Sequence, residues 1–150
     1  MTHISLSGIK QIAPDNNGTR LLFLDDKGDG YIYNPVNDAL LEIPFLPVSV
    51  KGFVWESGPS DQPLFAVYDD ENIHVYLYSP NHIRGPQCGK VNTTRLPPSH
   101  IPLVLTGSSV ICISQSGKTS EIPFDIPKTG SPDSVEWARE AISQHITMGR

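Results

Sequence analysis

The chain has 150 residues, with 11 lysines and arginines against 16 aspartates and glutamates, and its formal net charge at pH 7 is -5. This length allows one domain of ordinary size, or a part of a larger one, but not two well-packed cores. The acidic balance and the scattered basic residues argue against binding to a phosphate backbone, so we expect no nucleic-acid partner.

The N-terminal residues 1–8 have no basic flank and no apolar run of signal-peptide length. No window approaches the roughly 20 apolar residues that a membrane span needs. We therefore expect a soluble intracellular protein without a direct membrane span. Cys88 and Cys112 would then lie in a reducing compartment, and their spacing matches no metal motif, so both are interpreted as ordinary thiols.

Short apolar runs separated by turn residues dominate the first 125 positions. The 14 prolines and 12 glycines fall mostly between these runs, which is typical of an all-β protein with closely spaced turns. A first group of predicted strands covers residues 9–12, 21–24, 31–33 and 40–43. A second group covers 50–55, 64–68 and 73–78, and closes weakly with 89–92. A third, shorter group covers 101–105, 109–113 and 119–123.

The acidic segment 24–34 between two of these strands allows two interpretations, a calcium loop or a hairpin turn. An EF-hand loop needs oxygen ligands at its first, third and fifth positions and a bidentate Glu at its twelfth. Counting from Asp25, the third position is Lys27 and the twelfth is Val36, and neither side chain binds a cation. The flanking residues favour strands rather than helices, so the hairpin turn is the favoured interpretation.

The first two groups repeat one another. Leu24-Asp25-Asp26 corresponds to Tyr68-Asp69-Asp70, and residues 31–35 correspond to 76–80, at an offset of 44 to 45 residues. A repeat of about 40 to 45 residues that holds four short strands is typical of a propeller blade. We predict a mainly β fold, a partial WD-repeat-like β-propeller over residues 1–126 with about three four-stranded blades. The blades lie near 8–46, 49–95 and 100–125, and the third is truncated.

From Ser131 onward the apolar period changes to that of a helix. Ser131 suits the N-cap and Pro132 the first helical position. We predict an amphipathic α-helix over residues 131–149 that begins a helical-repeat solenoid. Its apolar stripe supplies the candidate interface residues, which are Val135, Ala138, Ile142 and Ile146.

Three blades do not close a ring, because propellers typically have about 4 to 8 of them. An open arc leaves strand edges and blade faces uncovered. We therefore expect the chain to be part of a longer protein or to assemble with another piece.

No residue pattern points to catalysis, and we expect no catalytic residues, no cofactor and no metal site. The five histidines stand far apart from one another and from cysteine. The run Asp69-Asp70-Glu71 is interpreted as a solvated turn rather than a carboxylate cluster. Four aromatic residues allow either a peptide-binding rim or a blade core, and their place inside strands favours the core. These residues are Trp55, Tyr68, Tyr76 and Tyr78.

Several longer runs resemble a known family. They are residues 15–21 (Asp-Asn-Asn-Gly-Thr-Arg-Leu), 29–39 (ending in Pro-Val-Asn-Asp-Ala), 42–44, Lys51-Gly52 with Trp55-Glu56, 68–70 and 115–118. Together they are similar to the large WD-repeat and helical-repeat subunit of intraflagellar transport complex A. The similarity covers roughly residues 8–122, and it implies the C-terminal part of that family's second propeller, with the final helix leading into the solenoid.

This resemblance implies a function without catalysis. The chain would be a scaffold segment that supports retrograde ciliary transport and the ciliary entry of membrane proteins through protein-protein contacts. Its partners would be other subunits of intraflagellar transport complex A, and its location the cytoplasmic side of the cilium or flagellum and the basal body. The alternative is a propeller segment of a vesicle-coat-like or other WD-repeat assembly.

Overall fold

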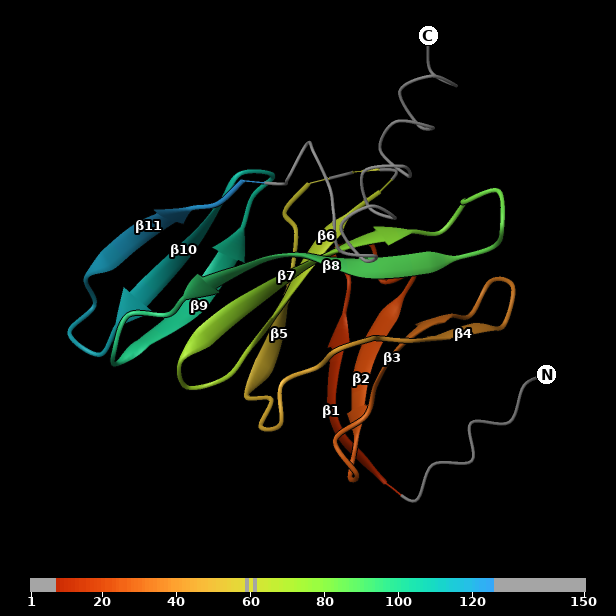
Figure 1. Ribbon diagram of the computed structural model, residues 1–150, viewed down its shortest axis with the longest axis horizontal. Coiled ribbons are helices and arrows are strands. Elements are labelled where there is room, and N and C mark those ends of the chain that lie inside the picture. Colours follow the sequence, from red (N-terminus) through yellow and green to blue (C-terminus); the bar gives the residue numbers. More distant parts are fainter. Residues whose placement is uncertain (1–7, 59, 61, 126–150) are drawn as a thin grey trace, which may run out of the picture.

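The computed structural model describes residues 8–58, 60 and 62–125, and this part of the chain contains eleven strands and no helix (Figure 1). The mainly β prediction is therefore confirmed. The predicted helix over 131–149, with its four candidate interface residues, lies outside the described residues. The strands are β1 (Ile9–Pro14), β2 (Leu21–Asp25), β3 (Gly30–Asn34), β4 (Ala39–Glu42), β5 (Gly52–Trp55), β6 (Leu64–Tyr68), β7 (Asn72–Ser79), β8 (Gln87–Arg95), β9 (His100–Leu105), β10 (Ser109–Ser114) and β11 (Thr119–Pro123).

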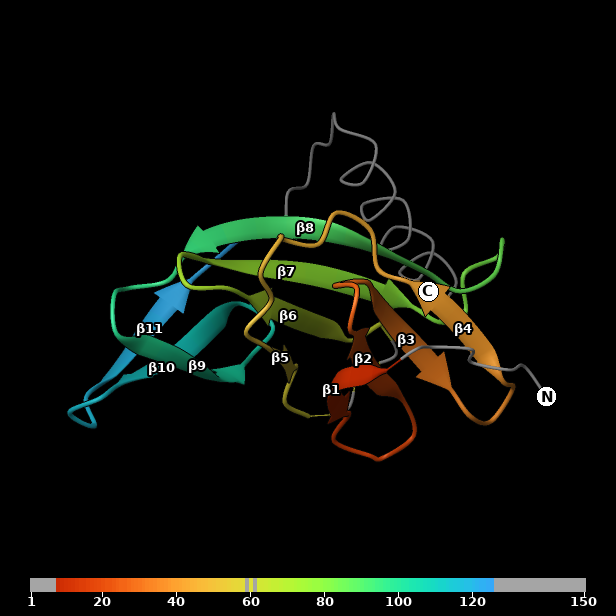
Figure 2. The same ribbon diagram turned by 90° about the horizontal axis from the view of Figure 1, so that it is seen from below.

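These strands form three antiparallel meanders, which are consistent with partial propeller blades. Strands β1 to β4 make sheet A, β5 to β8 make sheet B, and β9 to β11 make sheet C, each in chain order. Sheet B lies between the other two, as the two perpendicular views agree (Figures 1 and 2). Strands β1, β5 and β9 are neighbours at the inner side, where Glu56 and Leu105 form a parallel bridge between sheets B and C.

Sheet C has three strands among the described residues, which agrees with the truncated third blade that the sequence predicts. Directly after β11, Phe124 leaves the edge of sheet C. The Phe124 backbone N–H donates to the Ser108 carbonyl at 3.0 Å, and the Phe124 ring enters the core between sheets B and C. Burial of this aromatic ring fixes the position of the chain directly after β11.

Strand β8 is longer than the weak closing run 89–92 predicted. It covers nine residues and pairs with β7 along its whole length, from Asn72 opposite Arg95 to Ser79 opposite Gln87. Most residues of β8 are polar, so its own sequence gives little strand signal. The apolar strand β7, which leaves one edge open to pairing, decides its length.

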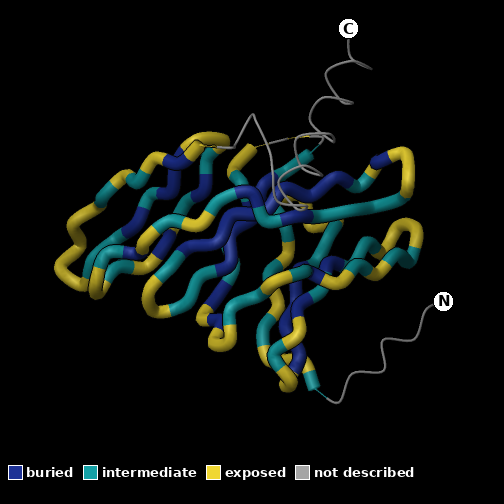
Figure 3. The backbone as a smooth tube through the Cα atoms, in the orientation of Figure 1, coloured by how far each residue is buried: buried dark blue, intermediate teal, exposed yellow. Residues whose placement is uncertain are grey.

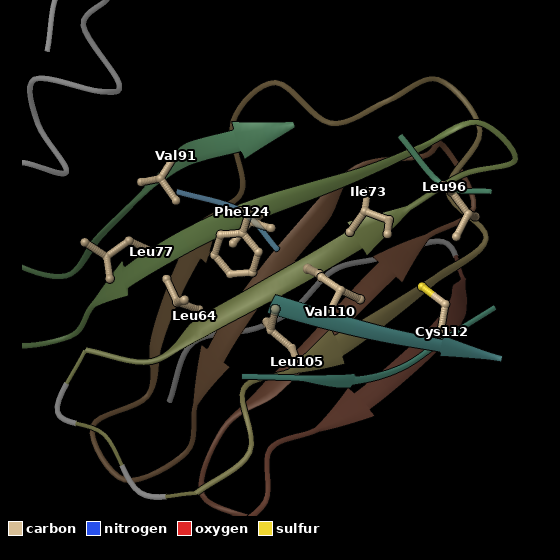
Figure 4. Packing of buried hydrophobic residues seen from close by; sticks show 11 residues of the cluster. Leu64, Ile73, Leu77, Val91, Leu96, Leu105, Val110, Cys112 and Phe124 are labelled. Atoms are coloured by element: carbon tan, nitrogen blue, oxygen red, sulfur yellow. The ribbon is translucent and has the colours of Figure 1, made fainter. Parts of the chain in front are cut away.

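The core consists of two clusters, one on each face of sheet B, and the dark tube of Figure 3 follows this central sheet. The cluster between sheets A and B contains Leu22, Leu24, Ile32, Ile43, Val50, Trp55, Phe65, Val67, Tyr76 and Tyr78. The cluster between sheets B and C contains Leu64, Ala66, Ile73, Val75, Leu77, Val91, Leu96, Leu105, Val110, Cys112 and Phe124 (Figure 4). Alternation along β6 and β7 sends neighbouring side chains to opposite clusters.

The acidic segment between β2 and β3 is a hairpin, as predicted. Leu24 pairs with Gly30, and the Asp25 carboxylate accepts hydrogen bonds from the backbone N–H groups of Lys27 and Asp29 at 3.0 and 2.9 Å. Gly28 has a φ of 90°, which an L side chain rarely adopts. Asp25 is buried, and its carboxylate orders the turn by accepting these two backbone hydrogen bonds.

Candidate functional site

The contact between sheets A and B, here called the A–B seam, is aromatic and hydrogen-bonded. The Trp55 indole N–H donates to the Ala13 carbonyl at 2.9 Å. The Tyr76 hydroxyl donates to the carbonyls of Pro44 and Phe45, at 3.0 and 3.1 Å, and its ring stacks on Phe65 with centroids 5.0 Å apart. Each tether joins a side chain of sheet B to the backbone of sheet A or of the linker after it, so the seam has a defined geometry.

The four aromatic residues that sequence left between rim and core belong to the core. Trp55, Tyr76 and Tyr78 are buried in the A–B cluster, and Tyr68 packs partly buried against the other cluster. Burial, followed by the proximity of Cys88, raises the pKa of Tyr76 far above its usual value. This hydroxyl therefore stays protonated and serves as a donor to the two carbonyls, not as an acid or base.

The contact between sheets B and C, here called the B–C seam, is mainly aliphatic. Leu105 and Val110 are fully buried against Leu64 and Ile73 (Figure 4). A backbone hydrogen bond joins the two sheets, because the Ser57 N–H donates to the Leu105 carbonyl at 2.8 Å. This seam thus depends on close packing more than on side-chain hydrogen bonds.

Sheet A presents a second face against which no other sheet of the described residues packs. The pairings of Ile12 with Phe23, Phe23 with Tyr31 and Tyr33 with Leu40 place these side chains on the face away from sheet B. Phe23 and Tyr31 stack with centroids 5.3 Å apart, while Ile12 remains 56% exposed. The face is an aromatic and aliphatic surface of the kind that packs against another blade.

Sheet C has a corresponding uncovered face in the part of the chain that the structure resolves. Ile101 pairs with Ile113 on β10, and Ile101 and Leu103 are 54% and 51% exposed. Sequence reasoning expected uncovered faces in general but named none of these residues. The near-continuous apolar run of β9 was the available signal, since a strand with apolar residues on both faces is expected to be covered on both.

In three hairpins, at equivalent positions of the three sheets, a side-chain oxygen accepts hydrogen bonds from backbone N–H groups of the turn. Asp69, between β6 and β7, accepts hydrogen bonds from the backbone N–H groups of Glu71 and Asn72 at 2.8 and 2.7 Å, as Asp25 does in sheet A. In sheet C, Ser114 occupies this place and its hydroxyl accepts from the Lys118 N–H at 3.2 Å. The turn predicted for Asp69-Asp70-Glu71 is confirmed. The sequence repeat between Asp25 and Asp69 therefore reflects the same hydrogen-bonding role in two hairpins.

Asp69 also lies 3.8 Å from the Nε2 atom of His74, which is buried on the face of sheet B toward sheet A. Burial and the charge of Lys90 lower the pKa of His74, against the attraction of Asp69. Burial opposes ionisation of Asp69, but the two backbone hydrogen bonds and His74 outweigh it and hold its pKa below the usual value. Asp69 thus orders the hairpin through its backbone hydrogen bonds and also contacts the buried His74.

Two hollows of comparable volume occur on the surface. One of about 330 Å³ lies at the mouth of the B–C seam, where Lys51 and Asp70 form an exposed ion pair of 3.8 Å beside His100. The other, of about 370 Å³, lies between the outer strands β4 and β8 and is here called the outer groove. Its lining consists of Leu41, Glu42, Pro44, Pro86, Gln87 and Cys88.

The thiol in the outer groove is not activated as a nucleophile. Burial raises the pKa of the Cys88 thiol in the outer groove to about 12, so this thiol stays protonated. Within residues 8–58, 60 and 62–125, no group of three or more His, Cys, Asp or Glu side chains is arranged to hold a metal ion. Across the same residues no helix has the length and hydrophobicity to cross a membrane.

The chain is similar in sequence to known proteins. A family model described as the WDR19 second beta-propeller matches residues 2–125. WD repeat-containing protein 19 is 44% identical over 115 residues in Mus musculus and 42% identical over 114 residues in Homo sapiens, covering 77% and 76% of this chain. WD repeat-containing protein dyf-2 of Caenorhabditis elegans is 35% identical over 125 residues, or 82% of this chain. The matches span 8 to 9% of the lengths of these relatives.

The fold is also similar to one chain in the complex structure of the fission yeast SREBP-SCAP binding domains. The TM-score is 0.55 and the identity 16%, over 86% of this chain and 39% of that chain. At this identity the likeness bears on the fold alone. The family match over residues 2–125, the identities of 35 to 44% and the three meanders agree, and the chain belongs to the WDR19 family, in which it matches the second β-propeller.

Proposed function

We propose that this chain is a non-catalytic scaffold segment of intraflagellar transport complex A, which supports retrograde ciliary transport and the ciliary entry of membrane proteins. Membership of the WDR19 family is the observation that carries the proposal, through the role that the family resemblance implies. Its partners are other subunits of that complex. It acts on the cytoplasmic side of the cilium or flagellum and at the basal body.

The mechanism is one of shape. The two seams hold three sheets in a fixed arc, and the uncovered faces of sheets A and C offer apolar surface at the two ends of this arc. Burying Ile12 and Ile101 against further sheets would stabilise each contact by roughly 25 cal/mol per Å² of apolar area removed from water. A rigid arc of this kind sets the position of whatever is attached to its ends and loops.

Purification of the tagged protein from ciliated cells, followed by mass spectrometry, tests the proposal. We expect the wild-type protein to bring other subunits of the transport complex with it. A double variant with Ile12→Asp and Ile101→Asp should lose them, because each buried carboxylate would lack a partner. The control, Val36→Asp, adds the same kind of charge at an exposed turn residue and should behave as wild type.

Two outcomes would contradict the proposal. Wild-type protein that brings subunits of a vesicle coat instead would favour the alternative assembly. A double variant that is as abundant and as well folded as wild type, and still retains all transport subunits, would show that the uncovered faces do not support assembly.

A further inference from the structure

The outer groove lies where sheets A and B meet at their outer strands. Leu41, Glu42 and Pro44 come from β4 and the residues after it, and Pro86, Gln87 and Cys88 come from the start of β8. Leu41 and Cys88 pack from this side against the buried A–B cluster. The floor of the groove is therefore continuous with the core, and only its outer side is open.

A strained residue holds one rim of this groove in place. Phe45 has a φ of 57°, in the left-handed region that bulky side chains rarely adopt, and its side chain is 71% exposed. The Tyr76 hydroxyl fixes this conformation by donating to the carbonyls of Pro44 and Phe45. The fold thus keeps an aromatic ring exposed beside an apolar groove, which indicates a surface that receives another apolar element.

The described chain ends within reach of this groove. Phe124 is anchored in the B–C cluster, and the Asp125 carbonyl accepts a hydrogen bond of 2.8 Å from the Asn92 amide, in the second half of β8. Cys88 lies four residues from Asn92 along this strand, which is about 13 Å at 3.3 Å per residue. The five residues from 126 to 130 can span up to about 20 Å between Asp125 and Ser131, which is enough to cross the outer edge of β8.

The sequence beyond this exit matches the groove. The stripe of Val135, Ala138, Ile142 and Ile146 recurs at helical spacing over roughly 17 Å of helix axis. Arg139 lies four residues after Val135 and three before Ile142, so it borders the stripe, and Glu42 is the single charged residue in the groove lining. The apolar stripe bordered by Arg139 thus complements the apolar groove that contains Glu42.

We propose that the C-terminal segment of this chain, residues 131–149, docks as a helix in the outer groove through the stripe of Val135, Ala138, Ile142 and Ile146. The helix then bridges the outer strands of sheets A and B, and it leaves the propeller in a direction that β4 and β8 set. This assigns to the stripe a partner within the same chain, where sequence alone pointed to the next helix of a solenoid.

Amide hydrogen exchange on the full chain tests this docking. A double variant with Ile142→Asp and Ile146→Asp should raise exchange several-fold in residues 39–45 and 86–89, because a negatively charged stripe cannot be buried there. The control is Gln144→Asp with Thr147→Asp, which adds two carboxylates to the same helix away from the stripe. It should leave exchange in both segments as in wild type.

The same measurement distinguishes other occupants. Docking within one chain gives protection that does not change on dilution, whereas protection that falls on dilution, together with a dimer in sedimentation, would mean a second copy and overturn the proposal. Equal exchange in wild type and both double variants would also overturn it and leave the groove to a separate partner. All four substitutions lie after the last of the eleven strands in the sequence, so lost folding of the three sheets does not imitate either result.

Discussion

The A–B and B–C seams hold neighbouring sheets together with different kinds of side chain. At the A–B seam, aromatic rings fill the space and their polar ends reach backbone carbonyls across it, as Trp55 and Tyr76 do. At the B–C seam, leucine, isoleucine and valine side chains fill the space, and the hydrogen bond from Ser57 to Leu105 is a backbone one. The first seam fixes direction as well as distance, while the second depends mainly on close packing.

The difference between the seams affects the linker after β4, where Phe45 has a positive φ. The Tyr76 hydroxyl holds the linker at Pro44 and Phe45, directly beside the outer groove. Within the described residues, the side-chain hydrogen bond from Asn92 to the Asp125 carbonyl is the corresponding tether at the outer end of the B–C seam, and it holds the end of the chain rather than a linker between sheets. The aromatic seam is therefore the one that shapes a surface for a further element.

The largest effect is expected for Tyr76→Ala, which should lower the free energy of unfolding by about 3 to 5 kcal/mol. The ring is fully buried and stacked on Phe65, so its removal leaves a cavity and frees two carbonyls. Urea unfolding followed by tryptophan fluorescence measures the change. Tyr76→Phe keeps the ring and should cost only about 1 to 2 kcal/mol, which isolates the hydroxyl; equal losses for both variants would contradict the directional role.

At the aliphatic seam, Leu105→Ala should lower the free energy of unfolding by about 2 to 4 kcal/mol, through loss of buried methyl groups and the cavity that remains. Leu105 is fully buried, whereas Leu103 on the same strand is 51% exposed. Leu103→Ala is thus a matched control, and its effect should be near zero in the same urea titration. A similar loss for both leucines would mean that the uncovered face of sheet C is packed in solution.

The hairpin acceptors should show a smaller and graded effect. Asp69→Ala removes the acceptor for two backbone N–H groups and should cost about 1 to 2 kcal/mol in thermal unfolding. Asp69→Asn retains one acceptor oxygen and should cost less. Ser114→Ala, at the equivalent turn of sheet C, should cost least because its hydroxyl accepts a longer bond from an exposed turn; the reverse order would show that the three turns are not equivalent.

The smallest effect is a pH dependence confined to the A–B side. His74 has a lowered pKa, so below its ordinary value of about 6.5 the unfolded chain binds a proton more readily than the folded one. Stability should therefore fall as pH drops from 7 through the lowered folded value. Melting temperatures between pH 7.5 and 5 measure this fall, and His74→Gln should flatten it.

Asp69 contributes in a separate pH window. Its lowered pKa means that its stabilisation is present above the unfolded value of about 3.9 and is lost as pH falls further through the folded value. A Leu105→Ala variant should keep the wild-type pH dependence, since the aliphatic seam carries neither group. A His74→Gln variant with an unchanged slope between pH 7.5 and 5 would refute the assignment of that window to His74.

Local patterns were enough to predict most of the strands and the relation between them. The alternating apolar runs and the Asp-Gly turns fix strands such as β2 and β3 through short-range sterics, and the offset between Asp25 and Asp69 reveals the repeat. The hairpin at residues 24–34 was predictable because its hydrogen bonds lie within five residues of Asp25. Such features depend on residues that are close together in the chain, so they can be read from the sequence.

Other features were decided only by contacts between distant residues. The nine-residue length of β8 follows from the open edge of β7, and the position of the chain directly after β11 follows from burial of Phe124 between two sheets. The positive φ of Phe45 is held by Tyr76, 31 residues away. The sequence alone determined strands, turns and repeat, because these depend on local geometry; the tertiary structure decided edges, faces and the outer groove, because these depend on which surfaces meet.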